Sequence, residues 1–377
     1  MSLYDIAIAG AGPAGSVLAL LAARAHYRVL LVEKSRFDEP RFGETAPPEL
    51  RPVLTRVGLE HLLQAPFCRD APEVLSVWGS HEPVARSHIF SPYGSAFHLD
   101  RRAFDEALAI AARDAGADLR LGCSARFITQ PSSGYVVQLS TGERIRSRLG
   151  ILATGRVGGS IGLPYVRRYL DNNIAVAARF SSCRPQLDGR TVIEAVPGGW
   201  FYLAALPSNE FIAVFITSAA LIPGKRRARL RWWLEALART TVVRNALNGC
   251  RLPETLFVAD ARASFARSGG GDCWIAVGDA RIAPDPLSGQ GIIWAIDDAS
   301  LAMEHLASRE RRGLAQPMQA RTERDVGAYL LERSHVYAQE QRFKDDPYWA
   351  SMAQQRLAKN GRYQIIEEQQ KLRTRPD

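Results

Sequence analysis

The sequence lacks the features of a membrane-spanning or exported protein. Its 377 residues contain no run of about 18 uninterrupted apolar residues, the length that a transmembrane helix needs. The chain also runs from Met1 into apolar sequence without a charged leader. We therefore expect a soluble, cytoplasmic protein with no membrane partner.

Cysteine is scarce as well. The five cysteines, which form no CxxC pair and no cluster with histidine at metal-ligand spacing, are Cys68, Cys123, Cys183, Cys250 and Cys273. Cysteines scattered in this way indicate neither a disulfide framework nor a zinc site. The sequence thus predicts no metal, and it fits a reducing cytoplasm.

Lysine is rare, although the chain is basic. Of 48 Lys and Arg residues all but five are arginines, and the net charge is +9. The basic residues are spread over both halves of the chain, with no aromatic-interleaved basic patch and no known nucleic-acid-binding module. We expect no nucleic-acid partner. Net positive charge favours an acidic substrate or an acidic partner protein.

The N-terminal sequence is typical of a nucleotide-binding fold. Tyr4–Ala9 is an apolar run ended by glycine, Ala14–Ala25 is an alanine-rich helical segment, and Arg28–Val32 is a second apolar run. Apolar runs of this length are typical of parallel strands buried on both faces. The pattern predicts an α/β protein that opens with the β-α-β unit of a Rossmann-like sheet.

Three glycines follow the first strand at a diagnostic spacing, in the segment Gly10-Ala11-Gly12-Pro13-Ala14-Gly15. Gly10 allows a tight turn, Gly12 lets the backbone approach a pyrophosphate, and Gly15 lets the helix pack closely on the strand. Pro13 and Ala14 begin the helix, whose N-terminus offers free N–H groups to the phosphates. These residues are candidates for cofactor binding.

An acidic residue stands where a ribose is expected. Glu33 follows the second strand, 18 residues after Gly15, and its carboxylate can accept hydrogen bonds from the ribose hydroxyls of an adenosine. Lys34 is its neighbour and a further candidate cofactor contact. This fingerprint predicts a dinucleotide but does not separate FAD from NAD.

A second motif, far along the chain, favours FAD. Gly278-Asp279-Ala280, followed by Asp285-Pro286-Leu287-Ser288-Gly289-Gln290-Gly291, resembles the GD…P..G.G motif of the flavoprotein hydroxylases that share the para-hydroxybenzoate hydroxylase fold. The resemblance implies that Asp279 holds a ribityl hydroxyl. It also implies that Gly289 and Gly291 lie against the isoalloxazine ring, at the N-terminus of a helix. The cofactor candidates here are Gly278, Asp279, Pro286, Gly289, Gln290 and Gly291.

Two shorter segments agree with this family resemblance. Asp100-Arg101-Arg102-Ala103-Phe104-Asp105 resembles the DR..FD segment, which implies that Arg101 approaches the FAD diphosphate. Gly43-Glu44-Thr45-Ala46-Pro47 resembles the GES element of flavin-dependent tryptophan halogenases and their relatives, placed beside the flavin. The resemblance makes Glu44 the candidate catalytic acid or base.

The resemblance covers most of the chain, and its details separate the branches of the family. Halogenases of this group carry a relay lysine downstream of the GES element, whereas no lysine occurs here between Lys34 and Lys225. The segment Gly199-Trp200-Phe201-Tyr202-Leu203 also differs from their WxWxIP motif, so the sequence argues against halogenation. Leu152–Arg156 lacks the acid-bearing DG element of hydroxylases that take hydride from NADPH. The electron donor is therefore either NAD(P)H or a separate flavin reductase.

A closer likeness involves aromatic residues in two segments. Gly198–Tyr202 and the C-terminal stretch from Glu332 to Trp349 look like flavoprotein maturases that modify a tryptophan of a partner protein during tryptophylquinone formation. By this resemblance Trp200 and Tyr202 line the substrate pocket. Plain core packing is the alternative for these side chains.

The remaining patterns complete the expected architecture. Short β-branched and aromatic runs between Ile174 and Ile216 predict an antiparallel sheet, and the chain from about Arg309 is charged and helical. The expected division is a discontinuous FAD-binding domain (residues 1–46, 96–165 and 262–308), an inserted substrate domain (47–95 and 166–261) and a helical C-terminal segment (309–377).

The function implied by the resemblance is FAD-dependent monooxygenation. A flavin C4a-hydroperoxide, formed from reduced FAD and O₂, would hydroxylate an electron-rich ring such as indole or phenol, either free or in a tryptophan of a partner protein. Two alternatives stay open: a reductase or dehydrogenase of the geranylgeranyl-reductase type, and a non-catalytic FAD-bound binding protein.

Overall fold

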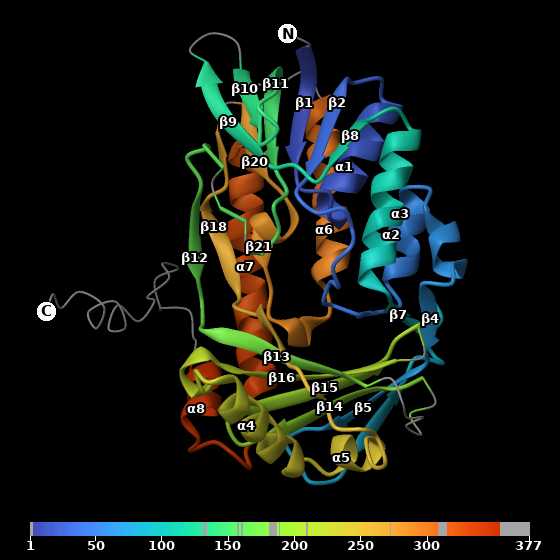
Figure 1. The fold of residues 1–377 in the computed structure, drawn as a ribbon, viewed down its shortest axis with the longest axis vertical. Helices are drawn as coiled ribbons and strands as arrows, with labels where there is room; N and C mark the ends of the chain where they lie inside the picture. Colours follow the sequence, from blue (N-terminus) through green and yellow to red (C-terminus); the bar gives the residue numbers. More distant parts are fainter. Residues whose placement is uncertain are drawn as a thin grey trace, which may run out of the picture.

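The chain forms two large sheets, one above the other in Figure 1. The computed structural model describes residues 3–130, 134–156, 158–159, 161–180, 187, 189–208, 210–271, 273–307 and 315–354. Part of the predicted C-terminal segment therefore lies outside the described residues. Its described part contains two helices, α7 and α8.

The upper sheet is the predicted Rossmann-like sheet. Its eight strands run in the order β19-β20-β11-β1-β2-β8, and β10 and β9 branch from β11. The five strands from β20 to β8 are parallel, and the other three are antiparallel to their neighbours. The strands are β1 (Leu3–Ala9), β2 (Val29–Glu33), β8 (Asp118–Leu121), β9 (Ala125–Gln130), β10 (Gly134–Leu139), β11 (Arg144–Leu152), β19 (Gly270–Gly271) and β20 (Trp274–Ala276).

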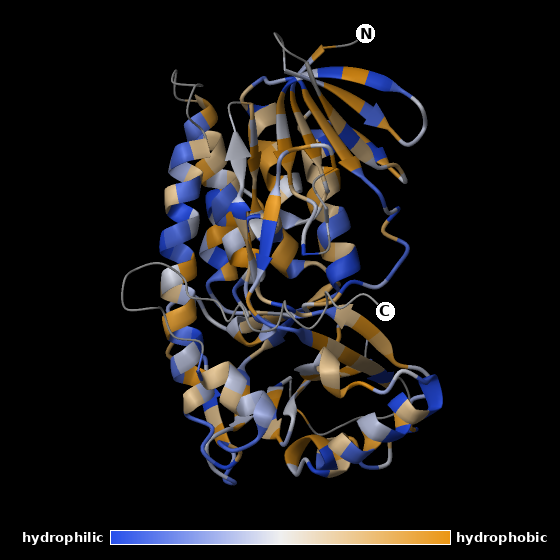
Figure 2. Cartoon of the chain, turned by 90° about the vertical axis from the view of Figure 1, so that its left-hand side faces the viewer, coloured by the Kyte–Doolittle hydropathy of each residue, from blue (hydrophilic) through white to orange (hydrophobic). Residues whose placement is uncertain are grey.

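Both faces of this sheet are buried, which explains its apolar strands. Ile6 and Ile8 of β1 belong to the core formed with α1, α3 and α6, whereas Ala7 and Ala9 face a second core that includes the β9–β10 hairpin. In Figure 2 these strands are coloured mostly as hydrophobic. The α-helices are α1 (Pro13–Arg24), α2 (Leu50–Arg56), α3 (Arg101–Asp114), α4 (Arg226–Ala238), α5 (Val242–Ala246), α6 (Gly291–Ala307), α7 (Ala315–Ala338) and α8 (Pro347–Ala353).

The lower sheet has seven strands in the order β17-β13-β16-β15-β14-β5-β6. Its strands are antiparallel except for the β14–β5 pair. They are β5 (Glu73–Val77), β6 (Val84–Ser87), β13 (Asn173–Phe180), β14 (Thr191–Val196), β15 (Gly199–Ala205), β16 (Phe211–Ser218) and β17 (Phe257–Asp260). The α/β class with an inserted, mainly antiparallel sheet is thus confirmed.

Two small sheets and four 3₁₀ turns connect these layers. One sheet joins β3 (Thr45–Ala46), β7 (Ala96–Leu99) and β4 (Cys68–Ala71), and the other joins β12 (Val166–Tyr169), β18 (Ser264–Ser268) and β21 (Ile282–Ala283). The turns are η1 (Glu60–Gln64), η2 (Ala219–Leu221), η3 (Gly278–Ala280) and η4 (Pro286–Ser288). Helix α2 buries Leu50 and Leu54 in the core of the upper sheet. The proposed domain boundaries stay a prediction.

One sequence-based expectation about cysteine is wrong. Cys68, Cys123 and Cys273 are free thiols, but Cys250 is disulfide-bonded. Spacing along the chain did not show this bond, because disulfide partners meet through the fold and not through a short motif. Among the described helices, none is long and apolar enough to cross a membrane.

Candidate functional site

The glycine turn after β1 has the shape of a phosphate cradle. Gly10 has a φ of +106°, and a Cβ there would lie 2.2 Å from the Ala153 carbonyl oxygen. A Cβ on Gly15 would lie 1.9 Å from the Gly10 carbonyl oxygen, whereas one on Gly12 would meet nothing within 4 Å. Gly10 and Gly15 are thus fixed by packing, and Gly12 borders open space. No side chain caps α1, so its first N–H groups are free for an anion.

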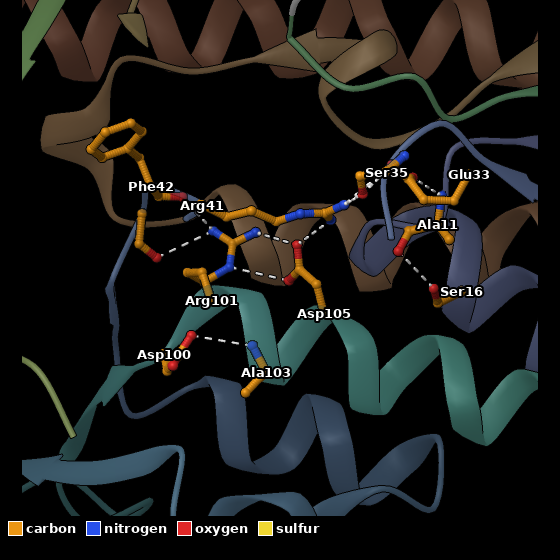
Figure 3. Close-up of polar contacts among 11 residues, drawn as sticks. Ala11, Ser16, Glu33, Ser35, Arg41, Phe42, Asp100, Arg101, Ala103 and Asp105 are labelled. Carbon is orange, nitrogen blue, oxygen red and sulfur yellow. Dashed lines mark hydrogen bonds and ion pairs between the residues drawn. The ribbon is translucent and has the colours of Figure 1, made fainter. Parts of the chain in front are cut away.

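Glu33 is held at the end of β2 beside this turn, as Figure 3 shows. Its Oε2 accepts a hydrogen bond from the Ala11 N–H at 2.8 Å, and its Oε1 accepts from the Ser35 backbone at 3.1 Å and hydroxyl at 2.9 Å. The side chain is 6% exposed. A carboxylate fixed at this place suits a ribose, as the sequence predicts. Lys34, the other candidate here, is exposed, and its side chain makes no hydrogen bond within the described residues.

Arg101 begins α3 and lies across the loop that carries Glu44 (Figure 3). Its Nη1 donates to the carbonyl oxygens of Phe42 at 3.1 Å and Gly43 at 3.2 Å, and its Nε donates to Asp105 at 3.2 Å. Burial by itself would lower the pKa of Arg101, but the Asp105 carboxylate outweighs it and the pKa is raised. Arg101 therefore stays positively charged. Its partner Asp105 also pairs with Arg41, and Arg41 pairs in turn with Glu33. A cation here fits a diphosphate.

The second motif packs directly against the first. Gly278 has a φ of +59°, and a Cβ there would lie 2.7 Å from the Cβ of Ala14 in α1. Its N–H donates to the buried Asp298 of α6 at 2.9 Å. Asp279, the candidate ribityl contact, pairs with Arg156 at 3.5 Å. The two motifs therefore lie side by side in the fold, although they are far apart in the sequence.

The loop from Asp285 to Gly291 ends at the N-terminus of α6. Asp285 accepts a hydrogen bond from the Leu287 N–H at 2.8 Å, which fixes the turn that contains Pro286. Gly289 has a φ of +62°, and a Cβ on it would meet nothing within 4 Å. A Cβ on Gly291 would lie 3.9 Å from Asp279. The loop thus presents bare backbone, with Gln290 between the glycines, and a helix N-terminus. This combination fits a flat ring that gains negative charge on reduction, such as a flavin.

Glu44 is a buried carboxyl group with an unsatisfied oxygen. It is 3% exposed, its Oε2 accepts from the Gly43 N–H at 3.0 Å, and its Oε1 has no hydrogen-bond partner within the described residues. Burial raises the pKa of Glu44, against the opposing charges of Arg101 and Arg179. A carboxyl group in this state can hold a proton and exchange it with a bound molecule.

The tyrosine predicted to line the substrate pocket lies next to this carboxyl group. Tyr202 of β15 and Thr45, the residue after Glu44, share a hydrogen bond of 2.5 Å between their hydroxyl oxygens. Burial, followed by the nearby Glu44 charge, raises the pKa of Tyr202 well above its usual value. The phenol is therefore neutral and joins the lower sheet to the candidate catalytic loop.

Trp200, on the same face of β15, is enclosed in an aromatic cluster. It is 1% exposed, its Nε1 donates to the Tyr337 hydroxyl at 3.0 Å, and its ring lies 6.4 Å from that of Trp78. Trp349 of α8 completes the cluster. The structure thus brings Tyr202 to Glu44 and places Trp200 behind it, among packed rings.

Sequence reasoning missed the polar link between this cluster and the cofactor loop. Tyr337 of α7 donates from its hydroxyl to Asp285 Oδ2 at 2.9 Å, and it accepts from Trp200 at the same hydroxyl. Arg41, which bridges the two carboxylates of the upper site, was missed too. Tyr337 lies in the stretch from Glu332 to Trp349 that the family resemblance covered, but its partners Trp200 and Asp285 are distant in sequence. No local pattern marks Arg41, whose partner Asp105 is 64 positions away. Among the described residues no group of three potential metal ligands occurs.

Comparison with known proteins places these features in a family. The family model described as tryptophan halogenase matches residues 79–374. The putative FAD-dependent oxidoreductase LodB of Marinomonas mediterranea is 27% identical over 358 residues, which cover 93% of this chain and 96% of LodB. A menaquinone reductase of Mycobacterium tuberculosis is 29% identical over 321 residues, or 81% of this chain and 77% of that protein.

Solved structures share the fold. The myxobacterial chondrochloren halogenase CndH, a variant of FAD-dependent halogenases, superimposes with a TM-score of 0.83 at 20% identity, covering 99% of this chain and 88% of CndH. The peptidyl tryptophan dihydroxylase QhpG, essential for tryptophylquinone biogenesis, superimposes with a TM-score of 0.76 at 24% identity, covering 93% of this chain and 79% of QhpG. The fold predicted from the motifs is therefore the fold of these flavoproteins.

Proposed function

The chain belongs to the tryptophan halogenase family of FAD-dependent oxidoreductases, and from this premise we propose that it is a monooxygenase that hydroxylates an electron-rich aromatic ring. Membership makes the chain an enzyme, so the non-catalytic alternative is not pursued. The finer question is which reaction the site carries out.

The proposal rests on two observations together: Glu44 is present and buried, and the lysine that halogenases carry is absent. Glu44 is buried, protonatable and unsatisfied at Oε1. The sequence from residue 35 to residue 224 contains no lysine, so the amine that would relay an oxidised halide is missing. Glu44 without a relay amine suits oxygen transfer, because hydroxylation of the substrate ring needs a group that gives or takes a proton and needs no halogen carrier.

The proposed cofactor contacts follow from the geometry above. The glycine turn and α1 hold the diphosphate with Arg101, and Glu33 holds the adenosine ribose. Asp279 and the backbone at Gly289–Gly291 hold the ribityl chain and the ring. When bound and reduced, FAD supplies the two electrons that activate O₂ for attack on the ring.

In the overall reaction, a ring C–H becomes C–OH. One oxygen atom of O₂ enters the product and the other leaves as water. The two electrons and one proton come as hydride from NAD(P)H, either directly or through a separate flavin reductase, and the second proton comes from solvent. Glu44 moves a proton at the reacting ring, and the Tyr202–Thr45 pair holds the loop of Glu44 against the lower sheet. Burial of Glu44, beside the half-buried Thr45 and Tyr202, keeps water away from the reacting atoms.

We propose further that the ring is an indole, presented as a tryptophan of a partner protein. Support comes from the likeness to QhpG, whose substrate is a peptidyl tryptophan, and from the aromatic residues in the lower half of the molecule. Free indole or phenol is the alternative substrate.

Two other reactions have specific support. Halogenation is favoured by the family and by the fold of CndH. Hydrogenation of an isoprenoid or quinone is favoured by the identity with a menaquinone reductase. Hydroxylation adds oxygen to the product, halogenation adds a halogen and hydrogenation adds hydrogen, so the mass of the product distinguishes the three reactions.

The test uses the whole protein supplied with FAD, NADH and a separate flavin reductase. A short peptide with one tryptophan is incubated in air with bromide present, and products are identified by mass spectrometry. We expect addition of oxygen, and a loss of about 100-fold in rate for Glu44→Gln. The exposed Glu49→Gln serves as the matched control and retains the rate. Bromination would contradict hydroxylation, and so would turnover only with a menaquinone analogue.

A further inference from the structure

Most of the net charge of the chain is concentrated in one short segment. Residues 225–246 contain seven Lys and Arg residues but only one acid, Glu235. This excess of six positive charges compares with a net charge of +9 for all 377 residues. The segment comprises α4, α5 and their flanks, below the lower sheet in Figure 1.

The way α4 is seated turns this charge outward. Trp233 is fully buried and its Nε1 donates to the Val176 carbonyl oxygen at 2.9 Å, with Ala236 and Leu237 in the same core. The opposite face of the helix is therefore the exposed one. Arg227 and Arg231 lie on this face, and the other exposed basic residues of α4 and its caps are Lys225, Arg226 and Arg239.

Little of this charge is neutralised within the chain. Arg231 pairs with Glu235 at 2.9 Å, but the Arg231 side chain is still 83% exposed. Across the described residues, Arg226 and Arg227 make no hydrogen bond or ion pair. Exposed, unpaired guanidinium groups on one rigid helix are pre-arranged for a partner's anionic groups.

The same face contains an open groove with an apolar floor. Leu230, Leu234 and Ala238 line it together with Arg227, Arg231 and Glu235, the acid that pairs with Arg231. An acidic protein segment that also carries apolar side chains matches this lining, because its carboxylates reach the arginines while its apolar groups fill the floor.

Nucleic acid and membrane fit this face less well. The aromatic rings of α4 point inward, since Trp233 is buried and the ring of Trp232 packs on Phe215 at 5.3 Å, which leaves no ring for base stacking. A membrane surface would require apolar side chains that project beyond the arginines, whereas Leu230 and Leu234 are half-buried.

We propose that α4 is a docking surface for an acidic segment of a partner protein. The surface lies on the opposite face of the lower sheet from Tyr202, because Phe201 belongs to the core under α4 and Tyr202 to the core on the other side. This inference goes beyond the proposed reaction. Docking uses none of the residues assigned to FAD, so each can fail without the other.

The test measures binding of fluorescently labelled poly-L-glutamate to the FAD-loaded protein by anisotropy. The variant carries Arg226→Gln, Arg227→Gln and Arg231→Gln. The matched control carries the same change at three exposed arginines of the upper half, Arg113, Arg126 and Arg144. FAD content and thermal unfolding show that both variants are folded.

We expect the α4 variant to bind poly-L-glutamate about ten-fold more weakly than the unaltered protein, and the control variant to bind it nearly as well. Equal weakening in both variants would overturn the proposal, because the effect would then be net charge alone. Tighter binding of a single-stranded oligonucleotide, or of phosphatidylglycerol vesicles, than of poly-L-glutamate at equal salt would also overturn it.

Discussion

The upper and lower halves of the molecule build their sites in opposite ways. In the upper half, backbone atoms form the site. Glycines bring strand, helix and loop so close together that an added Cβ at Gly15 would lie 1.9 Å from a carbonyl oxygen. In the lower half, large side chains form the site. The ring of Tyr337 packs on Trp349, and its hydroxyl group accepts a hydrogen bond from Trp200. An added Cβ is therefore excluded at the packed glycines Gly10 and Gly15, whereas the aromatic site is sensitive to the loss of side-chain atoms.

The two halves meet at the loop that carries Glu44. The loop belongs to β3, which pairs with β7, and His98 of β7 reaches Thr191 of the lower sheet at 2.9 Å. Tyr202 of the lower sheet reaches Thr45. The candidate catalytic carboxyl group thus stands at the contact between a glycine-built site and an aromatic-built site. The predictions below test this contrast, from the largest effect to the smallest.

The largest effect is expected at the glycine turn. Gly15→Ala should cost about 3 kcal/mol or more and prevent FAD binding, because its Cβ would collide with the Gly10 carbonyl oxygen. Gly12→Ala is the control for packing, since its Cβ meets nothing within 4 Å. It should fold normally and bind FAD more weakly. Thermal unfolding and bound FAD, measured for both, check this; a stable Gly15→Ala protein would refute the close packing.

The next effect concerns the contact between the halves and appears at acidic pH. Burial lowers the pKa of His98 to about 4, so the folded protein keeps this imidazole neutral. The unfolded chain takes up the proton below its ordinary pKa of about 6.5, and stability should therefore fall as pH decreases from there toward about 4, by up to about 3 kcal/mol.

His98→Gln should remove this contribution to acid sensitivity while keeping a partner for Thr191. Unfolding free energies measured by denaturant at about pH 7 and about pH 5 give the difference, which we expect to be smaller in the variant by about 2 kcal/mol. An unchanged pH dependence would show that His98 is not a buried neutral group.

A smaller effect is expected in the aromatic site. Tyr337→Phe keeps the ring but removes the hydroxyl that joins Trp200 to Asp285, which leaves two buried polar groups without that partner. We expect a loss of about 2 kcal/mol in stability and weaker FAD binding, because Asp285 fixes the cofactor loop. Tyr93→Phe, at a 40% exposed position, is the control. Stability loss with unchanged FAD affinity would mean that the link is only structural.

The smallest effect on stability is expected at Glu44. Burial raises its pKa in the folded protein, so ionisation of this group opposes folding as pH rises above the ordinary carboxyl value. Glu44→Gln should therefore be at least as stable as the unaltered protein at neutral pH, with the advantage shrinking in acid. Denaturant unfolding at both pH values measures it. A clear loss of stability at neutral pH would indicate an ionised, paired carboxylate instead.

The contrast between the halves also explains what could be predicted from sequence. The strand predicted for Tyr4–Ala9 is found as β1, which starts one residue earlier and ends at the same residue, and the helix predicted for Ala14–Ala25 is found as α1, shifted by one residue. Local rules fix these elements: buried strands are apolar, and the glycine spacing sets the turn. Helix α3 begins at Arg101 because Asp100 caps it by accepting the Ala103 N–H at 3.2 Å.

Long-range contacts account for what was missed. Trp200 and Tyr337 lie in the two segments that the family resemblance covered, but the hydrogen bond between them spans 137 positions and no sequence pattern specifies it. Strand β9, the short strands between residues 68 and 87, and helix α4 were not predicted. The segment of α4 is dominated by arginine, and its burial depends on Trp233 reaching the lower sheet, which periodicity alone does not reveal.

The most direct test of the account is the source of the oxygen atom in the product. The FAD-loaded protein is reduced, supplied with isotopically labelled O₂ in ordinary water, and given the tryptophan peptide; oxygen uptake and product mass are followed together. The account predicts one labelled oxygen atom in each hydroxylated product, with one O₂ consumed for it. Unlabelled oxygen in the product, or turnover without oxygen uptake, would contradict it.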